Sequence, residues 1–247
     1  MAVKRIQLHK GQVFSTKNHG DLEVLYHNNS RDVGVRFIDT GFMVTGVQVG
    51  NVVRGNIKDI LMRTVQGVGY LNTNEKVAKT DCYRYWHGML ERAYSEKYHA
   101  TRPTYKDVEV CRDWHDFTEF RKWFEANYIK GYHLDKDILG NGKLYSPENC
   151  CFVPIYINCM ITDIPTKRGD CPRGVSKRKT KGTDNYNGLY NVAANGIYLG
   201  RYDCPNKAHE VYKEFKEFLV HEVAESYYER GLISDRVRDG LYDWKVV

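Results

Sequence analysis

The side chains best suited to chemistry lie in one stretch, residues 134–158. Asp135 and Asp137 flank Lys136 at the end of an apolar run, so two carboxylates sit around one cation. Gly140-Asn141-Gly142 follows as a turn signal, because glycine and asparagine tolerate positive φ. Acids and amides that face one cleft make an oxygen-rich site of the kind that hard divalent cations prefer.

Two further elements must position these side chains. Ser146-Pro147-Glu148-Asn149 is a second turn, and Cys150 to Val153 is a short apolar run with β propensity. Pro154 then stands where a first helical turn can begin. The stretch therefore predicts a strand, a turn, a second strand and the start of a helix.

This stretch resembles the HNH family of ββα-metal (His-Me finger) endonucleases, in a version common in phage genomes. In that family a metal ligand and a general-base histidine end the first strand, an asparagine follows in the loop, and a second ligand lies on the helix. The resemblance implies that Asp135 is the first ligand and that Asn149 is the loop asparagine. It implies Asn158, nine residues later, as the second ligand, and Lys136 stands at the position of the base.

The resemblance also implies a cofactor and a set of bases. Mg²⁺ or Mn²⁺ would be held by Asp135 and Asn158, with room left for water and phosphate. A lysine normally carries its proton near neutral pH and cannot accept another. The base is therefore Lys136 made neutral by burial, neighbouring Asp137, or His133, while Asn149 orients the base or the first strand.

Composition indicates a globular chain with room for two or three small domains. The chain has 247 residues, 42% hydrophobic and 28% charged, with a formal charge of +6. Its seven cysteines include no C-x-x-C pair, so we expect free thiols and no structural zinc. The first residues lack an apolar signal region, and no run of about 18 apolar residues exists to cross a bilayer. We therefore expect a soluble cytoplasmic protein without a membrane partner.

The basic residues gather between residues 167 and 181. Seven lysines and arginines stand there against one acid, Asp170, so the segment has a net charge of +6. Asn195-Gly196 between two β-prone runs predicts a hairpin, and a long helix is expected from about Pro205. A basic sheet backed by a helix favours binding to a polyanion.

This order resembles the apetala-type (AP2-like) DNA-binding domain of plants and phage nucleases. Arg173-Gly174-Val175 and Tyr198-Leu199-Gly200-Arg201-Tyr202 carry the resemblance. The family lays a three-stranded sheet in the major groove and packs one helix behind it, which implies double-stranded DNA as the partner. The candidate DNA-binding residues are Arg168, Arg173, Lys177, Arg178, Lys179, Lys181, Tyr190, Tyr198 and Arg201.

The predicted fold class is α+β with three parts. Short strands over residues 1–60 predict a small β-barrel. Residues 61–166 are expected to hold helices and the HNH-like ββα unit, and residues 167–247 the AP2-like domain, a three-stranded sheet plus one long helix with a C-terminal tail.

Three functions follow from these parts. The first is a DNA-binding phage protein, resembling an HNH homing-type endonuclease, that hydrolyses phosphodiesters of duplex DNA with a divalent metal. The second is a catalytically degenerate HNH-like protein that only binds DNA. The third is a regulatory or counter-defence factor that binds a protein, for which the C-terminus, Asp239 to Val247, is as suitable as it is for closing the fold.

Overall fold

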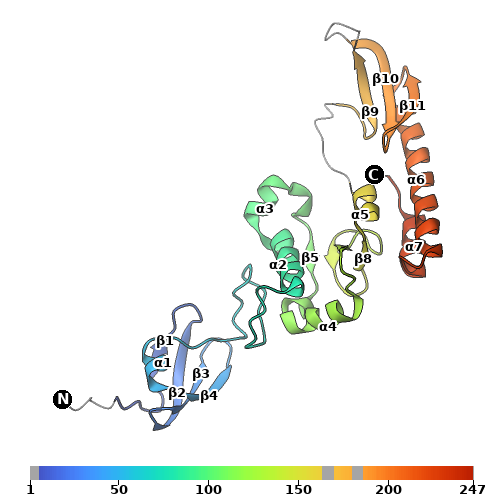
Figure 1. The fold of residues 1–247 in the computed structure, drawn as a ribbon. Coiled ribbons are helices and arrows are strands. Elements are labelled where there is room, and N and C mark those ends of the chain that lie inside the picture. The colour runs from blue at the N-terminus through green and yellow to red at the C-terminus, as the bar shows by residue number, and fades with distance from the viewer. Residues whose placement is uncertain (1–5, 163–169, 180–185, 247) are drawn as a thin grey trace. The chain divides into compact units, whose positions relative to one another are not determined.

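The computed structural model describes residues 6–162, 170–179 and 186–246. The fold is mixed α+β, which confirms the predicted class. The chain divides into two compact units, Met1–Ala126 and Asn127–Val247 (Figure 1). The boundary predicted between residues 166 and 167 falls inside the second unit.

The first unit begins with a four-stranded antiparallel sheet. Each strand pairs with the next along the chain, and a short helix, α1, follows the last strand. The elements are β1 Val13–Ser15, β2 Asp21–Asn29, β3 Asp32–Phe37, β4 Met43–Val47 and α1 Val49–Val53.

This sheet does not close into the predicted barrel. Within the described residues, β1 and β4 are edge strands that pair with no further strand of the sheet. Val49 and Val52 of α1 pack with Leu8 and Ile57 against the apolar face of the sheet. These residues bury the surface that barrel closure would otherwise cover.

The helical region of the first unit follows the predicted pattern. Thr80 caps α2 by accepting the amide hydrogen of Tyr83 at 3.1 Å, as its place before the apolar run predicts. Trp86, Met89 and Leu90 are fully buried. The elements are α2 Asp81–Tyr94, α3 Glu96–Thr101, the 3₁₀ turns Pro103–Tyr105 and Arg112–His115, β5 Glu109–Val110 and α4 Phe117–Asn127.

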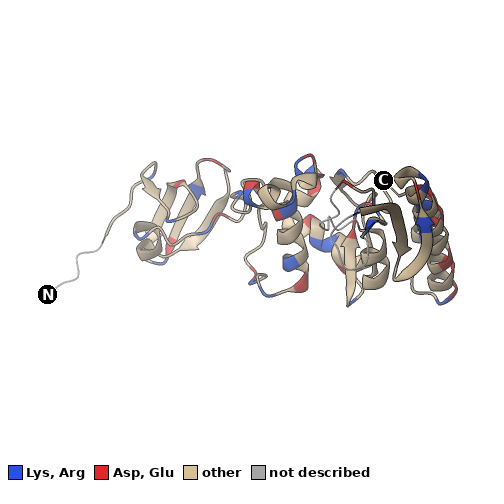
Figure 2. Ribbon diagram, turned by 90° about the horizontal axis from the view of Figure 1, so that it is seen from above, with Lys and Arg blue, Asp and Glu red and all other residues tan. Residues whose placement is uncertain are grey.

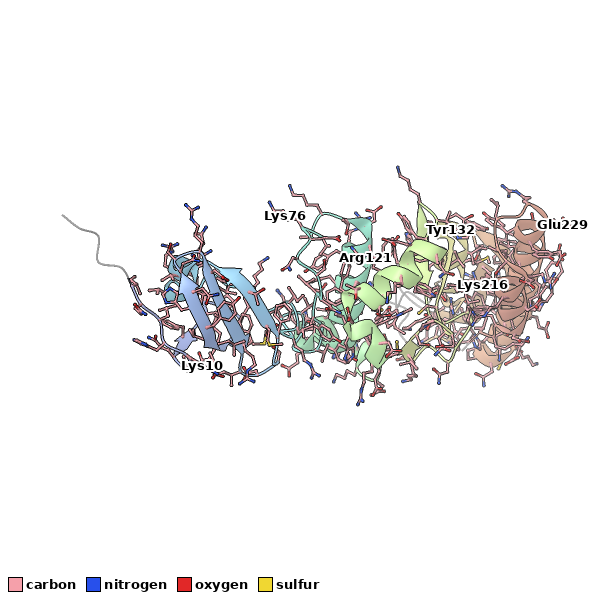
Figure 3. The ribbon with its side chains drawn as sticks, turned by 90° about the horizontal axis from the view of Figure 1, so that it is seen from below. Lys10, Lys76, Arg121, Tyr132, Lys216 and Glu229 are labelled. Carbon is pink, nitrogen blue, oxygen red and sulfur yellow. The ribbon has the colours of Figure 1, made fainter. Side chains whose placement is uncertain are left out.

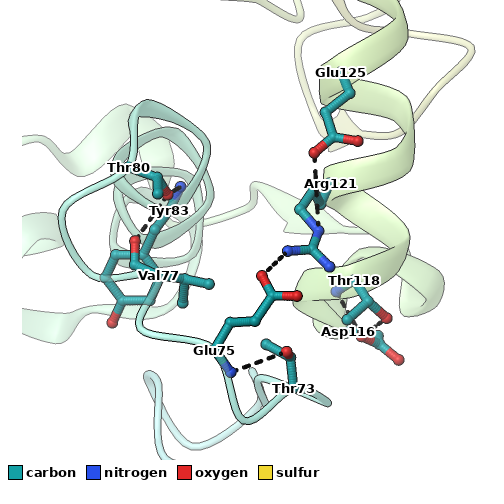
Figure 4. Close-up of polar contacts among 9 residues, drawn as sticks. All are labelled: Thr73, Glu75, Val77, Thr80, Tyr83, Asp116, Thr118, Arg121 and Glu125. Atoms are coloured by element: carbon teal, nitrogen blue, oxygen red, sulfur yellow. Dashed lines mark hydrogen bonds and ion pairs between the residues drawn. The ribbon is translucent and has the colours of Figure 1, made fainter.

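Polar contacts fix the segment before α2 to the start of α4 (Figure 4). Asp116 accepts hydrogen bonds from the Thr118 backbone at 2.7 Å and from the Asn72 side-chain amide at 2.7 Å, so it caps the start of α4. Arg121 on α4 bonds Glu75 at 2.6 Å. The buried carboxylate of Asp116 is thus satisfied and has a structural role.

The described part of the second unit contains a two-stranded sheet, a three-stranded sheet and three helices. β6 and β8 pair antiparallel, with His133 opposite Val153 and Asp135 opposite Cys151. We call β6, β8 and α5 the ββα unit. The elements are β6 Tyr132–Asp135, β7 Leu144–Tyr145, β8 Cys151–Pro154, α5 Ile155–Ile161, β9 Val175–Lys179, β10 Tyr186–Ala194, β11 Ile197–Tyr202, α6 Pro205–Glu229 and α7 Asp235–Asp243.

One long helix, α6, belongs to both cores of this unit. Its N-terminal half places Ala208 and Tyr212 against the β9–β10–β11 sheet. Its C-terminal half places Val220 and Ala224 against α5 and α7 (Figure 1). The sheet and the ββα unit are therefore joined by a continuous helix and not by a linker alone.

The C-terminal residues close the fold of the second unit. Val246 is buried in the core under the sheet, and Trp244 packs against both cores. Lys245 bonds Glu217 of α6 at 3.0 Å. Of the two roles that the sequence leaves open for this segment, the structure shows the closing role. In the part of the chain that is described, no helix has the length and apolar composition to cross a membrane.

Candidate functional site

Three predicted site residues lie on one face of the ββα unit. Side chains two apart on a strand share a face, so His133 and Asp135 point the same way from β6. Asn158 of α5 donates its amide hydrogen to Nδ1 of His133 at 3.3 Å. Since an amide NH₂ group only donates, His133 must present a bare Nδ1 there. This bond turns the amide oxygen of Asn158 away from the imidazole.

Asp135 is buried and held by the backbone of the turn that follows it. Its Oδ1 accepts the amide hydrogens of Asp137 and Ile138, each at 2.8 Å. Within the described residues these are the hydrogen bonds that the Asp135 carboxylate accepts, and both go to Oδ1. Oδ2 is therefore the oxygen left for a cation. Burial, and then the charge of Asp137, raises the pKa of Asp135 to about 6. Near pH 6 a proton therefore competes for this carboxylate.

Lys136 points into the loop and pairs with an acid. Its Nζ lies 2.8 Å from Oδ1 of Asp137, and its side chain is 8% exposed whereas that of Asp137 is 55% exposed. Nζ also lies 5.7 Å from the centre of the Tyr145 ring. A Cβ at Gly142 would lie 2.4 Å from the same Asp137 oxygen, so the loop needs glycine there. The lysine at the position of the family base is thus engaged with Asp137.

Asn149 closes the loop between the two strands. Its side-chain amide donates to the Leu144 carbonyl at 3.3 Å, and its backbone amide donates to Oγ of Ser146 at 3.3 Å. A Cβ at Gly140 would lie 2.9 Å from Cγ of Asn149. This asparagine therefore holds the loop between β6 and β8, and its predicted role toward the base or the first strand stays a prediction.

The β9–β10–β11 sheet presents Tyr198 and Arg201 together. Residues three apart on a regular strand face opposite ways. A β-bulge at Leu199 and Gly200 interrupts the strand, and Gly200 there has φ of 124°. As a result Arg201 pairs with Asn191 and Tyr198 pairs with Ala193, which is two residues from Asn191 on β10. Both side chains thus share one face, and Nε of Arg201 donates to the Tyr198 hydroxyl at 3.0 Å.

We call this face the outer face, because α6 covers the other. Ser176 pairs with Asn191 and therefore lies on the outer face. Arg178 is two residues further along β9, so it lies on the same face. Sequence reasoning missed Asn191, although the alternation with buried Val192 was a usable signal. Arg178, Asn191, Tyr198 and Arg201 therefore form a polar row that can meet hydrogen-bonding partners.

Other predicted DNA-binding residues lie elsewhere. Lys177 pairs with Tyr190, and the ring of Tyr190 packs on the core beneath the sheet, so both belong to the helix-covered face. Arg173 precedes β9 and donates to the Thr162 carbonyl at 3.3 Å. Arg168 and Lys181 lie outside the described residues, and of Lys179 only its place at the end of β9 is described.

The two sides of the C-terminal sheet differ in charge. The strands β9, β10 and β11 contain no acid, and two of their four basic residues, Arg178 and Arg201, lie on the outer face. In contrast, α6 carries six glutamates against three lysines, and Figure 2 shows acidic and basic residues along it. A polyanion would therefore be attracted to the strands and repelled by the helix.

Lys216 is a buried cation that sequence reasoning missed. The residue, labelled in Figure 3, is 4% exposed. Its Nζ donates to Oδ1 of Asn195 at 2.6 Å. Asn195 has φ of 49° in the turn between β10 and β11. Burial, and then the charge of Arg173, lowers the pKa of Lys216 to about 8. This lysine ties α6 to the turn at a cost in desolvation.

The variant Lys216→Met should be more stable than the wild type at pH 7. The pKa of Lys216 in the folded state lies below the ordinary value of 10.5. The wild type is therefore fully stable above pH 10.5, where this lysine is neutral, and it loses stability as pH falls through 8 and the buried lysine becomes charged. We expect the variant to gain about 1–3 kcal/mol at pH 7 and much less at pH 10. Urea unfolding at both pH values measures this, with Lys213→Met as control. A gain that is equal at both pH values would assign the effect to packing alone.

The described residues hold no preformed cluster of three His, Cys, Asp or Glu side chains that could bind a metal ion. A cation at the ββα unit would instead rely on one carboxylate oxygen, the Asn158 amide oxygen, water and phosphate, which are oxygen donors suited to Mg²⁺ or Mn²⁺. Comparison with protein-family models, curated proteins and solved structures finds no match for the chain.

Proposed function

We propose that the protein binds duplex DNA through the outer face of its C-terminal sheet and cleaves it at the ββα unit with a divalent cation. The observation that carries the binding is the charge difference between the acid-free strands and the glutamate-rich helix behind them. Tyr198 supports it, since its hydroxyl holds the guanidinium of Arg201 in one orientation on the outer face. An arginine fixed in this way is suited to phosphate or to guanine edges.

Three features of the ββα unit support cleavage. The hairpin and helix have the order of the HNH family, and His133, Asp135 and Asn158 lie on one face of the unit. Asp135 is oriented by two backbone amides, as metal-binding carboxylates commonly are. A divalent cation bound by Asp135 and Asn158 would stabilise charge on the scissile phosphate and on the leaving oxygen. His133 would hold the amide of Asn158 in its binding orientation.

A second candidate function is DNA binding without cleavage. It is favoured by Lys136, which replaces the family's base histidine and is engaged in an ion pair with Asp137. The two candidates separate in one experiment. Supercoiled plasmid is incubated with excess protein and Mg²⁺ or Mn²⁺, and binding to the same DNA is measured in parallel. Nicked or linear plasmid supports the nuclease, and binding without either product supports the second candidate.

The double variant Arg178→Ala/Arg201→Ala should weaken DNA binding and its salt dependence. Each lost phosphate contact should lower the slope of log affinity against log salt by about 0.9. Fluorescence anisotropy from 50 to 200 mM salt measures both quantities. The matched control, Lys207→Ala/Lys213→Ala on α6, removes the same charge from the opposite side and should change little. If the control loses as much affinity as the double variant, the outer face is not the interface.

A further inference from the structure

An aromatic platform is exposed on α5 and α6 of the second unit. The rings of Tyr156 and Tyr227 are nearly parallel, with 8° between their planes and 6.3 Å between their centres. Tyr156 is 50% exposed, and its neighbour Ile155 is 49% exposed. Large apolar side chains adjacent to one another on a surface commonly mark a contact site. None of the residues placed beside Asp135 and Asn158 or on the outer face belongs to this platform.

A cation borders the same platform. The guanidinium carbon of Arg230 lies 5.2 Å from the centre of the Tyr227 ring. Tyr227 also packs on the core beneath it, which fixes its ring in place. Glu229, two residues after Tyr227, lies about 200° around the helix and so points elsewhere. The exposed ring of Tyr156, backed by Tyr227 and bordered by an arginine, complements the flat face and the phosphate of a nucleotide.

The platform lies on the flank of α5 opposite to Asn158. Tyr156 and Asn158 are two residues apart, which is about 200° around a helix. A helix is about 10–12 Å wide, so a DNA strand that passes from Asn158 across α5 would bring a flanking nucleotide to Tyr156. Bases inside an intact duplex have no free face for stacking, so the nucleotide must be unpaired.

We infer that Tyr156 and Tyr227 stack an unpaired DNA base next to the ββα unit, with Arg230 contacting its phosphate. This inference rests on the proposed DNA binding and adds the class of substrate, namely duplex DNA that contains a gap or an unpaired base. The sheet supplies affinity for the duplex, and the platform supplies a preference for the irregular position.

The test compares an intact duplex with the same duplex that carries a short single-stranded gap. Because phosphate contacts do not depend on sequence, a mixed sequence at low salt is sufficient. The gap contains 2-aminopurine, whose fluorescence falls when it stacks. Wild type should bind the gapped duplex about tenfold more tightly than the intact one and quench the probe.

Tyr156→Ala should remove the preference and the quenching while leaving affinity for the intact duplex unchanged. Tyr156→Phe should keep both, because it keeps the ring. Tyr228→Ala is the matched control, since this exposed tyrosine of α6 contacts Arg238 and not Tyr156. Thermal unfolding checks that each variant is folded.

Three results would overturn the inference. A Tyr156→Ala variant that keeps the preference removes the platform from the DNA site. If the wild type binds both duplexes equally and does not quench the probe, the platform is a protein contact site and not a stacking site for DNA. Wild type that binds neither duplex overturns the proposed function itself and the stacking site with it.

Discussion

Replacing Asp135 by asparagine should reduce metal-dependent DNA cleavage to background while leaving DNA binding intact. Asparagine keeps the oxygen that accepts the amide hydrogens of Asp137 and Ile138, so the turn should survive. It removes the negative charge that a divalent cation requires. The sheet and Arg201 are distant in sequence and keep their contacts. Plasmid cleavage and duplex binding, measured together, check both expectations.

The same variant should be more stable than the wild type at pH 7. The folded-state pKa of Asp135 is raised to about 6, above its ordinary value of 3.8, so protonation favours the folded state. The stability that protonated Asp135 contributes is present below pH 3.8 and lost as pH rises through 6. We expect the asparagine variant to gain about 1–3 kcal/mol at pH 7 and much less near pH 4.

Asp239→Asn is the matched control for this prediction. Asp239 lies on α7 in a surface ion pair with Arg238, so this variant loses the same charge outside the ββα unit. It should cleave and bind like the wild type. If Asp135→Asn cleaves normally in a folded protein, Asp135 is only the cap of its turn, and the ββα unit holds its cation elsewhere or holds none.

Replacing Lys136 by methionine should lower cleavage by about a hundredfold, the size expected when one fixed charge at a reacting phosphate is lost. Lys136 bonds Asp137 and lowers the pKa of Asp135 through its charge. Without it that pKa should rise further, so the acidic limb of the pH–rate profile should move to higher pH. A residue that only fills space in the loop would not produce this movement.

Two companion variants separate the roles of Lys136. Lys136→Arg keeps the positive charge and should keep much of the rate. Lys136→His restores the base that the HNH family normally has and should raise the rate above wild type. A folded arginine variant without activity would count against a charged role and in favour of a neutral lysine as the base.

Local signals in the sequence predict much of the secondary structure. Asn195-Gly196 forms the expected turn with φ of 49° and 80°, because few residues adopt positive φ without strain. Thr80 and Asp116 cap the helices that they precede. The four N-terminal strands lie where turn residues separate apolar runs. In each case the cause lies within a few residues of the effect.

Features that depend on distant parts of the chain could not be predicted in this way. The barrel does not close because α1 and Leu8 cover the sheet, and strand patterning does not show which element does so. Alternation assigns Tyr198 and Arg201 to opposite faces, and the bulge at Gly200 reverses that result. The ion pair of Lys136 depends on how the loop folds back, and the role of Lys216 depends on the packing of α6 against the turn.

The continuous helix α6 also restricts how this protein can change during evolution. A single inserted residue between Tyr212 and Val220 would rotate one half of the helix by about 100° relative to the other, and one of the two cores would lose its contacts. Seven inserted residues would nearly restore the rotation and lengthen the helix by about 10 Å, which is about three base pairs of DNA. If the protein binds and cuts DNA as proposed, the distance between the bound sequence and the cut can therefore change only in discrete steps during evolution. Insertions in α6 should survive only in multiples of whole helical repeats.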